Sequence, residues 1–357
     1  MSNNRTTKRL VHFDLMRIIA CFFVIFIHVN IFNEKDLLGN DSINNVFLGI
    51  FNVLARWSVP CFLMLSGMLF LERNKEISIK KLYGKYMLHL VVAYAFWSCV
   101  YALYNSFYDA GNSLIDKIKY FLSYCLSGEI HTWYVLVTIG LYMAIPIIKC
   151  VINKGSEQLI KYWIIVMFVF SSVVPCIVDM GLPFLSGYVK YINKYMELNF
   201  FLGYTLYFVL GYYLCNVQMS KKIKRLIYIL SIISLLYSLF ALIVLRGIFN
   251  YDISVLGYLY VNIVLMSMGV FMFFRDYVSK IKFSEKSKRI ITDLSKLTFG
   301  IYLIHVLILK IFSRVGYDVS IAPHYISYFL VSISTFIVSG IIICLIKKIP
   351  KISKFIC

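Results

Sequence analysis

The sequence predicts an all-α polytopic membrane protein, a single bundle of about ten transmembrane helices, and three observations lead to this class. Hydrophobic residues make up 61% of the chain and charged residues only 15%. The hydrophobic residues gather in runs of roughly 20, long enough for a helix to cross the ~30 Å hydrocarbon core of a bilayer. Lys and Arg concentrate in alternate connections between these runs. Helices are favoured because a spanning helix satisfies its own backbone hydrogen bonds.

The predicted spans follow the apolar runs along the chain. With the N-terminus in the cytoplasm, the basic connections fall on the cytoplasmic side, as the positive-inside rule requires. We therefore predict a transmembrane domain over 13–346 between cytoplasmic tails at 1–12 and 347–357, with both termini cytoplasmic. The ten spans are 13–32, 46–70, 82–104, 132–149, 160–180, 198–215, 226–245, 254–274, 291–313 and 324–346.

The net charge of +19 indicates membrane topology and no nucleic-acid partner, because the basic residues flank the spans. The lipid bilayer is the expected partner, and the protein is predicted to be a multi-pass protein of the cell membrane. The nine cysteines form no C-x-x-C pair, and no two histidines lie four residues apart. This pattern predicts neither a disulfide framework nor a metal site. The chain has no P-loop and no G-x-S-x-G motif, so any chemistry is expected to centre on histidine.

The first span, 13–32, contains Asp14, Arg17 and His28. Ionisable groups inside a membrane are costly, so their presence there suggests a functional site. Arg17 and His28 are separated by three helical turns plus roughly 20°, which places both on one face with a rise of about 16 Å between them. Asp14 lies three residues before Arg17, close enough to pair with it. The alternative is that Asp14 and Arg17 belong to the cytoplasmic interface.

The pattern D-L-x-R-I-x-A, with a histidine eleven residues after the arginine, resembles the first helix of the acyltransferase-3 family, and Arg17 and His28 match it. Three further stretches resemble the family in the same order: Val59–Phe70, Thr132–Ile148 and Phe299–His305. The resemblance implies a membrane O-acyltransferase with no permanently bound cofactor and with acetyl-CoA, or another acyl-CoA, as cytoplasmic co-substrate. Its implied acceptor is a hydroxyl of an extracytoplasmic carbohydrate, such as an exopolysaccharide, an O-antigen or a cell-wall glycan.

The resemblance places catalysis at His28, Arg17 and Asp14. A neutral His28 would act as general base on the acceptor hydroxyl or would relay the acyl group covalently. Arg17 would hold a phosphate of the donor, or would fix the first helix through Asp14.

Donor binding is expected at the start of the third span, where family members often carry Arg-x-x-Arg. The matching positions here are Leu82 and Lys85, so the two-pronged arginine geometry is lost. Positive charge for the donor phosphates could remain on Lys80, Lys81 and Lys85. The alternative is an ordinary positive-inside loop.

The acceptor pocket is expected at the predicted outer ends of the spans. Trp133 and Tyr134 match the family's Trp-aromatic pair, and an indole face can stack on a sugar ring; an interface anchor is the alternative. Glu129 and His131 precede this pair and could supply a second acid or base. Arg56 lies about ten residues into the second span, deep enough to need a partner, either a substrate or an ion pair with a neighbouring helix.

Two further positions complete the predicted architecture of the site. His305 would orient His28 or line the acceptor pocket, or it would form a packed polar pair with Tyr302, three residues earlier. Gly67 is expected to let the second span approach a neighbouring helix closely.

A protein of a different class also fits these residues. A transporter or flippase for a sugar, a lipid-linked intermediate or another small solute could use buried Arg and His in a proton-coupled pathway. No feature argues for a nonenzymatic membrane sensor.

Overall fold

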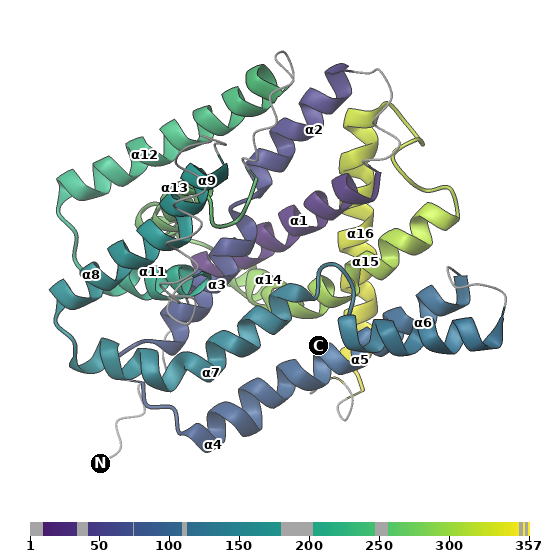
Figure 1. Cartoon of the computed structure of the whole chain (residues 1–357), viewed down its shortest axis with the longest axis horizontal. Coiled ribbons are helices and arrows are strands. Elements are labelled where there is room, and N and C mark those ends of the chain that lie inside the picture. The colour runs from purple at the N-terminus through teal and green to yellow at the C-terminus, as the bar shows by residue number, and fades with distance from the viewer. Residues whose placement is uncertain are drawn as a thin grey trace.

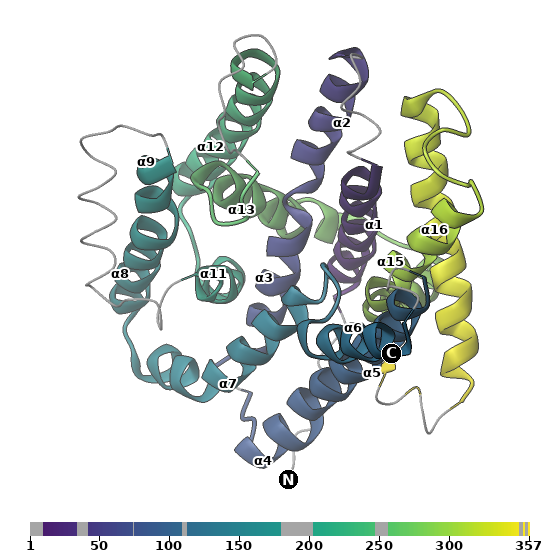
Figure 2. The ribbon, with the colours of Figure 1, turned by 45° about the vertical axis from the view of Figure 1, so that its right-hand side comes forward.

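The computed structural model of the 357-residue chain describes residues 10–33, 42–73, 75–108, 113–179, 203–246, 256–349, 353, 356 and 357. Within these ranges the protein consists of helices and short connections and contains no strand. Figures 1 and 2 show the helices gathered in one bundle. The predicted all-α class is confirmed.

The helices follow the apolar runs, and five of them begin at a serine whose side chain accepts a backbone N–H of the first turn. These N-caps are Ser78, Ser113, Ser156, Ser220 and Ser284. The α-helices are α1 (Val11–Asn33), α2 (Ser42–Ala55), α3 (Ser58–Phe70), α4 (Ile79–Lys81), α5 (Leu88–Tyr108), α6 (Leu114–Ser127), α7 (Trp133–Lys154), α8 (Glu157–Phe168), α9 (Val174–Asp179), α11 (Thr205–Asn216), α12 (Lys221–Phe240), α13 (Val261–Asp276), α14 (Glu285–Ser295), α15 (Thr298–Arg314) and α16 (His324–Lys347). Three π-helical segments, η1 (Leu82–Met87), η2 (Val169–Val173) and η4 (Ala241–Arg246), and one 3-10 helix, η5 (Val278–Lys280), continue these helices.

Eight helical segments in the described part of the chain are long and apolar enough to cross a membrane. The pair α14 and α15, bent by 55°, makes a ninth if it counts as one span. These nine correspond to nine of the ten predicted spans. The remaining one, 198–215, begins outside the described residues, and its described part is the 12-residue α11. The polytopic architecture is thus confirmed, while the count of ten and the side of each terminus stay predictions.

Helix α1 lies inside the bundle and packs against α2, α3, α13, α14, α15 and α16. Figure 2 shows it between α3 on one side and α15 and α16 on the other. Met16, Ala20, Ile25 and Phe26 are fully buried. The polar side chains Asp14, His28 and Asn30 of α1 are buried within the protein as well, whereas Arg17 is partly exposed.

Helices α3 and α11 pack backbone to backbone through two glycines. A Cβ at Gly67 would lie 1.8 Å from the Phe208 carbonyl oxygen, and one at Gly211 would lie 1.9 Å from the Met64 carbonyl oxygen. No side chain fits at either position. The close approach predicted for Gly67 is confirmed, and it brings α3 against the centre of the bundle.

The connection between the third and fourth predicted spans, 105–131, is more ordered than the sequence suggests. Helix α5 continues to Tyr108, and α6 returns alongside it, as Figure 1 shows. The chain then turns at Gly128, whose φ of +70° favours glycine and where a Cβ would lie 2.5 Å from the Thr132 hydroxyl oxygen. Because α6 returns along α5, the turn 128–132 lies in the interior, where Glu129 and His131 are buried. Irregular backbone at such depth is tolerated where protein surrounds it.

Candidate active site

Three histidines from distant parts of the chain meet in the interior. His28 lies on α1, His131 on the turn before α7, and His305 on α15. The ring centroid of His305 lies 4.9 Å from that of His28 and 5.0 Å from that of His131. The centroids of His28 and His131 are 6.0 Å apart. Their exposed fractions are 8%, 1% and 0% for His28, His131 and His305. The structure thus brings together three histidines that the sequence analysis names: His28, His305 and the candidate second acid or base His131.

The hydrogen bonds of these rings fix which nitrogen of the neutral imidazole carries the proton. His28 Nδ1 lies 2.8 Å from the Val24 carbonyl oxygen, and His305 Nδ1 lies 2.6 Å from the Tyr302 carbonyl oxygen. A carbonyl only accepts, so both Nδ1 atoms donate. His305 Nε2 is then an acceptor, 3.2 Å from His28 Nδ1. His28 keeps a free lone pair on Nε2, which is the form that a general base needs.

His131 is held by α15. Its Nε2 donates to the Leu303 carbonyl oxygen at 3.3 Å, and the Tyr302 hydroxyl donates to the His131 carbonyl oxygen. Tyr101 also donates to the Leu303 carbonyl oxygen, at 2.9 Å, and its ring packs against His131. His131 Nδ1 is buried and has no hydrogen-bond partner in the described part of the chain. A lone pair is therefore available there as well.

A buried ion pair lies beside the histidines. Lys310 Nζ is 2.6 Å from Glu129 Oε2 and 2.8 Å from Asn105 Oδ1, and the Asn105 amide donates to the same Glu129 oxygen at 3.1 Å. The backbone N–H of Ile130 donates to the other Glu129 oxygen at 3.2 Å. Glu129 was predicted as an acceptor residue, whereas Lys310 and Asn105 were missed. A lysine inside the apolar run 291–313 was the signal that could have identified Lys310.

Asp14 and Arg17 form the predicted pair. Arg17 Nη1 lies 2.7 Å from Asp14 Oδ1, and the Ser295 hydroxyl donates to the same oxygen at 2.9 Å. Asp14 is 1% exposed, so this carboxylate is buried within the protein. Its depth in the membrane, and with it the alternative of a cytoplasmic interface position, stays a prediction. Ser295 ends α14, and the bond therefore ties α1 to α14.

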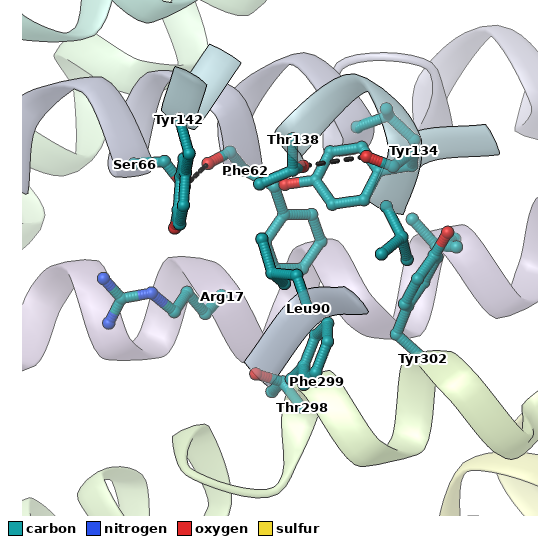
Figure 3. A pocket seen from close by; sticks show the side chains of 13 residues that line it. Arg17, Phe62, Ser66, Leu90, Tyr134, Thr138, Tyr142, Thr298, Phe299 and Tyr302 are labelled. Carbon is teal, nitrogen blue, oxygen red and sulfur yellow. Dashed lines mark hydrogen bonds between the residues drawn. The ribbon is translucent and has the colours of Figure 1, made fainter. Parts of the chain in front are cut away.

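Arg17 lines two cavities. One, of about 170 Å³, lies between α1, α3, α5, α7 and α15 and is mainly apolar. Figure 3 shows the Arg17 guanidinium at one end of this cavity and Tyr134 and Tyr302 at the other. The other cavity, of about 810 Å³, has apolar walls that include Phe13, Met68 and Leu69 together with several polar side chains: Arg17, His12, Asp14, Glu72, Asn216, Arg275 and Ser279.

The narrow cavity lies close to the histidines in sequence, although none of the three is among its lining residues. Each is three or four residues from one that lines it: His28 from Val24, His131 from Val135 and His305 from Tyr302. The wide cavity shares Arg17 with the narrow one. The two cavities together thus extend from the N-terminal end of α1 toward the part of the bundle that holds the imidazoles.

The other predicted residues lie in two groups. Lys80 and Lys81 on α4 and Lys85 on η1 are exposed and line neither cavity, so their donor role stays a prediction. The second group surrounds Trp133, whose ring lies 5.4 Å from that of Tyr204 and 5.6 Å from that of Tyr258.

Arg56 and Tyr134 connect this second group to the rest of the site. The Arg56 guanidinium lies 5.3 Å from the centroid of the Tyr258 ring. Tyr134 contacts Tyr302, with ring centroids 5.6 Å apart. Arg56 and Glu129 both lie within electrostatic range of His28. Trp133 and Arg56 thus share contacts with Tyr258, and Tyr134 contacts Tyr302, whose helix carries His305; their role in an acceptor pocket stays a prediction.

Residues 10–346 match the model of the acyltransferase 3 family, which is described as an acyltransferase domain. The match contains the three histidines, Arg17 and both cavities. No curated protein and no solved structure matched the chain. The chain therefore belongs to the acyltransferase 3 family and is a multi-pass membrane acyltransferase.

Proposed function

We propose that this protein transfers an acyl group, in the first instance acetyl, from cytoplasmic acyl-CoA to a hydroxyl of an extracytoplasmic surface carbohydrate. The observation that carries the proposal is the row of two cavities, which share Arg17 and extend toward the part of the bundle that holds His28. Such a row suits a long donor whose two ends differ in chemistry. An exopolysaccharide, an O-antigen or a cell-wall glycan would supply the acceptor hydroxyl.

The wide cavity suits the charged end of the donor. Arg17 and Arg275 line it, and guanidinium groups bind phosphate oxygens in pairs. Both are already paired with a carboxylate at 2.7 Å, Arg17 with Asp14 and Arg275 with Asp276. Arg17 is the better candidate for a phosphate because it lines both cavities. Lys80, Lys81 and Lys85 would contribute by attracting the anionic donor to this side of the membrane.

The narrow cavity suits the thin, uncharged arm that carries the thioester. It offers apolar walls at Phe62, Leu90 and Phe299, with hydroxyl groups at Ser66 and Thr138. The rise of about 16 Å from Arg17 to His28 is comparable to the length of an extended pantetheine arm. A donor anchored at Arg17 would therefore bring its thioester close to the histidines.

At the histidines, His28 would act through its unprotonated Nε2. It would take the proton of the acceptor hydroxyl while the hydroxyl oxygen attacks the thioester carbonyl carbon. The C–S bond then breaks, and the proton on His28 passes to the departing thiolate. His305 Nε2 accepts the His28 Nδ1–H, which keeps the ring in the required tautomer and stabilises the imidazolium that forms.

The test is transfer of label. Membrane vesicles from cells that produce the protein are supplied with acetyl-CoA radiolabelled in the acetyl group, and surface glycans are isolated and counted. We expect ester-linked label in glycan from the wild type and none from His28→Ala at equal abundance. A transporter would leave the chemistry of the glycan unchanged, so absence of label from wild-type glycan, with solute uptake present, refutes the proposal.

A further inference from the structure

Arg56 sits at a break in the second span, between the end of α2 at Ala55 and the start of α3 at Ser58. Its Nε donates to Asn52 Oδ1 at 2.8 Å, and the face of Tyr258 supplies its other contact. No carboxylate in the described ranges pairs with it. The ion pair with a neighbouring helix, offered by the sequence as one alternative, is therefore not formed there.

Three other basic side chains of the bundle have a carboxylate partner, whereas the buried Lys149 donates to the backbone carbonyl oxygens of Glu72 and Lys75. Arg17, Lys310 and Arg275 each lie within 2.7 Å of a carboxylate oxygen. Glu129, which is also within range of His28, has one oxygen bound by Lys310 and Asn105 and the other by a backbone N–H. Its charge is thus committed locally, whereas the described ranges show Arg56 in contact with Asn52 and Tyr258 and with no carboxylate.

Arg56 is also well placed relative to the chemistry. It contributes to the electrostatic environment of His28. Through Tyr258 it adjoins Trp133, the aromatic residue to which we assign sugar stacking. The residues Arg56, Trp133, Tyr204 and Tyr258 are partly accessible, and we call them the Arg56 cluster.

We propose that the acceptor is an anionic glycan, whose carboxylate or phosphate group binds the guanidinium of Arg56 while the sugar ring stacks on Trp133. A planar guanidinium binds either oxyanion with two parallel hydrogen bonds, and a partly desolvated site strengthens them. This inference rests on the proposed function, because it concerns the acceptor of the same reaction. It narrows the acceptor from any surface carbohydrate to one that bears a negative charge near the acylated hydroxyl.

Arg56 has a competing role that the same contacts permit. Its guanidinium could stabilise the oxyanion that forms on the thioester carbonyl during acyl transfer. In that case the loss of Arg56 would slow transfer to every acceptor equally, whatever its charge. The two roles therefore differ in one measurable quantity, the dependence on acceptor charge.

The first experiment uses the wild-type protein alone. Labelled surface glycan from cells that produce the protein is separated on an anion-exchange column, before and after its carboxylates are amidated with a carbodiimide and ethanolamine. We expect the ester-linked label to be retained on the column. Loss of retention on amidation identifies a carboxylate, and persistent retention identifies a phosphate. Label that elutes with neutral glycan overturns the inference and leaves the proposed function standing, whereas absence of label from all glycan refutes the proposed function itself.

The second experiment tests Arg56 directly. Unacylated glycan from cells that lack the protein serves as acceptor in vesicles, either native or with its charge removed by amidation or dephosphorylation. We expect Arg56→Gln to lower transfer to native glycan about 10- to 100-fold, chiefly through a higher KM, with Arg56→Lys intermediate. Removing the charge from the glycan should slow the wild type by a similar factor and should not slow Arg56→Gln further.

The matched control is Arg314→Gln. Arg314 also lies over tyrosine rings, 4.0 Å from the Tyr108 centroid, but it is exposed and distant in sequence from the Arg56 cluster. We expect its substitution to leave transfer unchanged. If Arg56→Gln slows transfer to charged and uncharged glycan by the same factor, or does not slow it at all, the inference is wrong.

Discussion

The ion pair between Glu129 and Lys310 provides a sharp test of how the turn 128–132 is held in the bundle. The pair is 2.6 Å long, and the side-chain exposures of Lys310 and Glu129 are 16% and 8%. Lys310→Met keeps most of the aliphatic stem and removes the charge. Glu129 would then be left as a buried carboxylate with Asn105 and one backbone N–H as its remaining donors.

The expected loss of stability follows from this burial. Removing one partner of a buried pair typically costs about 3–5 kcal/mol, because the remaining charge is uncompensated. The residual exposure of Lys310 and the bond from Asn105 place our expectation at the lower end, about 3 kcal/mol. In Glu129→Gln/Lys310→Met no charge remains, and the amide can still bond to Asn105. The double variant should therefore recover most of the stability that Lys310→Met loses.

The assay is the fraction of purified protein in detergent that stays monodisperse after heating, measured across a temperature series. Heat inactivation of membrane proteins is often irreversible, so midpoints are compared at one heating rate. Lys288→Gln, which breaks an exposed pair with Glu285 on α14, is the control and should leave the midpoint unchanged. A Lys310→Met midpoint equal to that of the wild type, or a double variant as unstable as the single one, would refute this account of the turn.

Four further predictions concern the site and the packing. His28→Ala should lower acyl transfer by about 10²–10⁴-fold at normal abundance in the label-transfer assay, while His89→Ala on α5 should not; near-normal transfer by His28→Ala would make this histidine structural. Arg17→Lys should raise the KM for acyl-CoA although it keeps the positive charge, because an ammonium cannot make the two-pronged contact with a phosphate. An unchanged KM would contradict the binding of a donor phosphate by Arg17. Replacing Lys80, Lys81 and Lys85 together by glutamine should raise the KM for acyl-CoA in the same assay without affecting membrane insertion. An unchanged KM would mean that these lysines only determine topology. Gly67→Ala should lower the heating midpoint because its Cβ would overlap the α11 backbone, whereas Gly140→Ala on α7, with no atom within 4 Å, should not; equal midpoints would contradict the close packing.

Much of the fold could be predicted because a bilayer imposes a simple rule on every span. A run such as 132–149 must be helical and apolar to cross, so hydropathy alone locates α7. The same rule says nothing about chain segments too short to cross. Helix α6 has 14 residues, and the turn 128–132 has no periodic pattern, so both were expected to lie in an outer loop. Their position depends on packing against α5 and α15, which no local pattern encodes.

The site was predictable to the extent that it lies on single helices. Helical geometry places Arg17 and His28 on one face of α1, and the pairing of Asp14 with Arg17 follows from their spacing. The contact between His28 and His305 joins residues 277 apart in sequence. Tertiary packing creates it, as it creates the contacts of Lys310 with Asn105 and of Tyr258 with Arg56. These partners carry no motif; Lys310 stands out only as a lysine inside an apolar run, and the contacts themselves appear only in the structure.

The apolar lining of the cavity that begins at Arg17 has a consequence for the leakage of ions across the membrane. A row of cavities through a bilayer would discharge the membrane potential if it filled with a continuous column of water. Here the constricted part holds about 170 Å³ between Phe62, Leu90 and Phe299, and apolar constrictions of this kind exclude ions by dewetting. If the proposed donor binds in these cavities, we expect the apolar side chains of Phe62, Leu90 and Phe299 to hinder the passage of ions when the donor is absent.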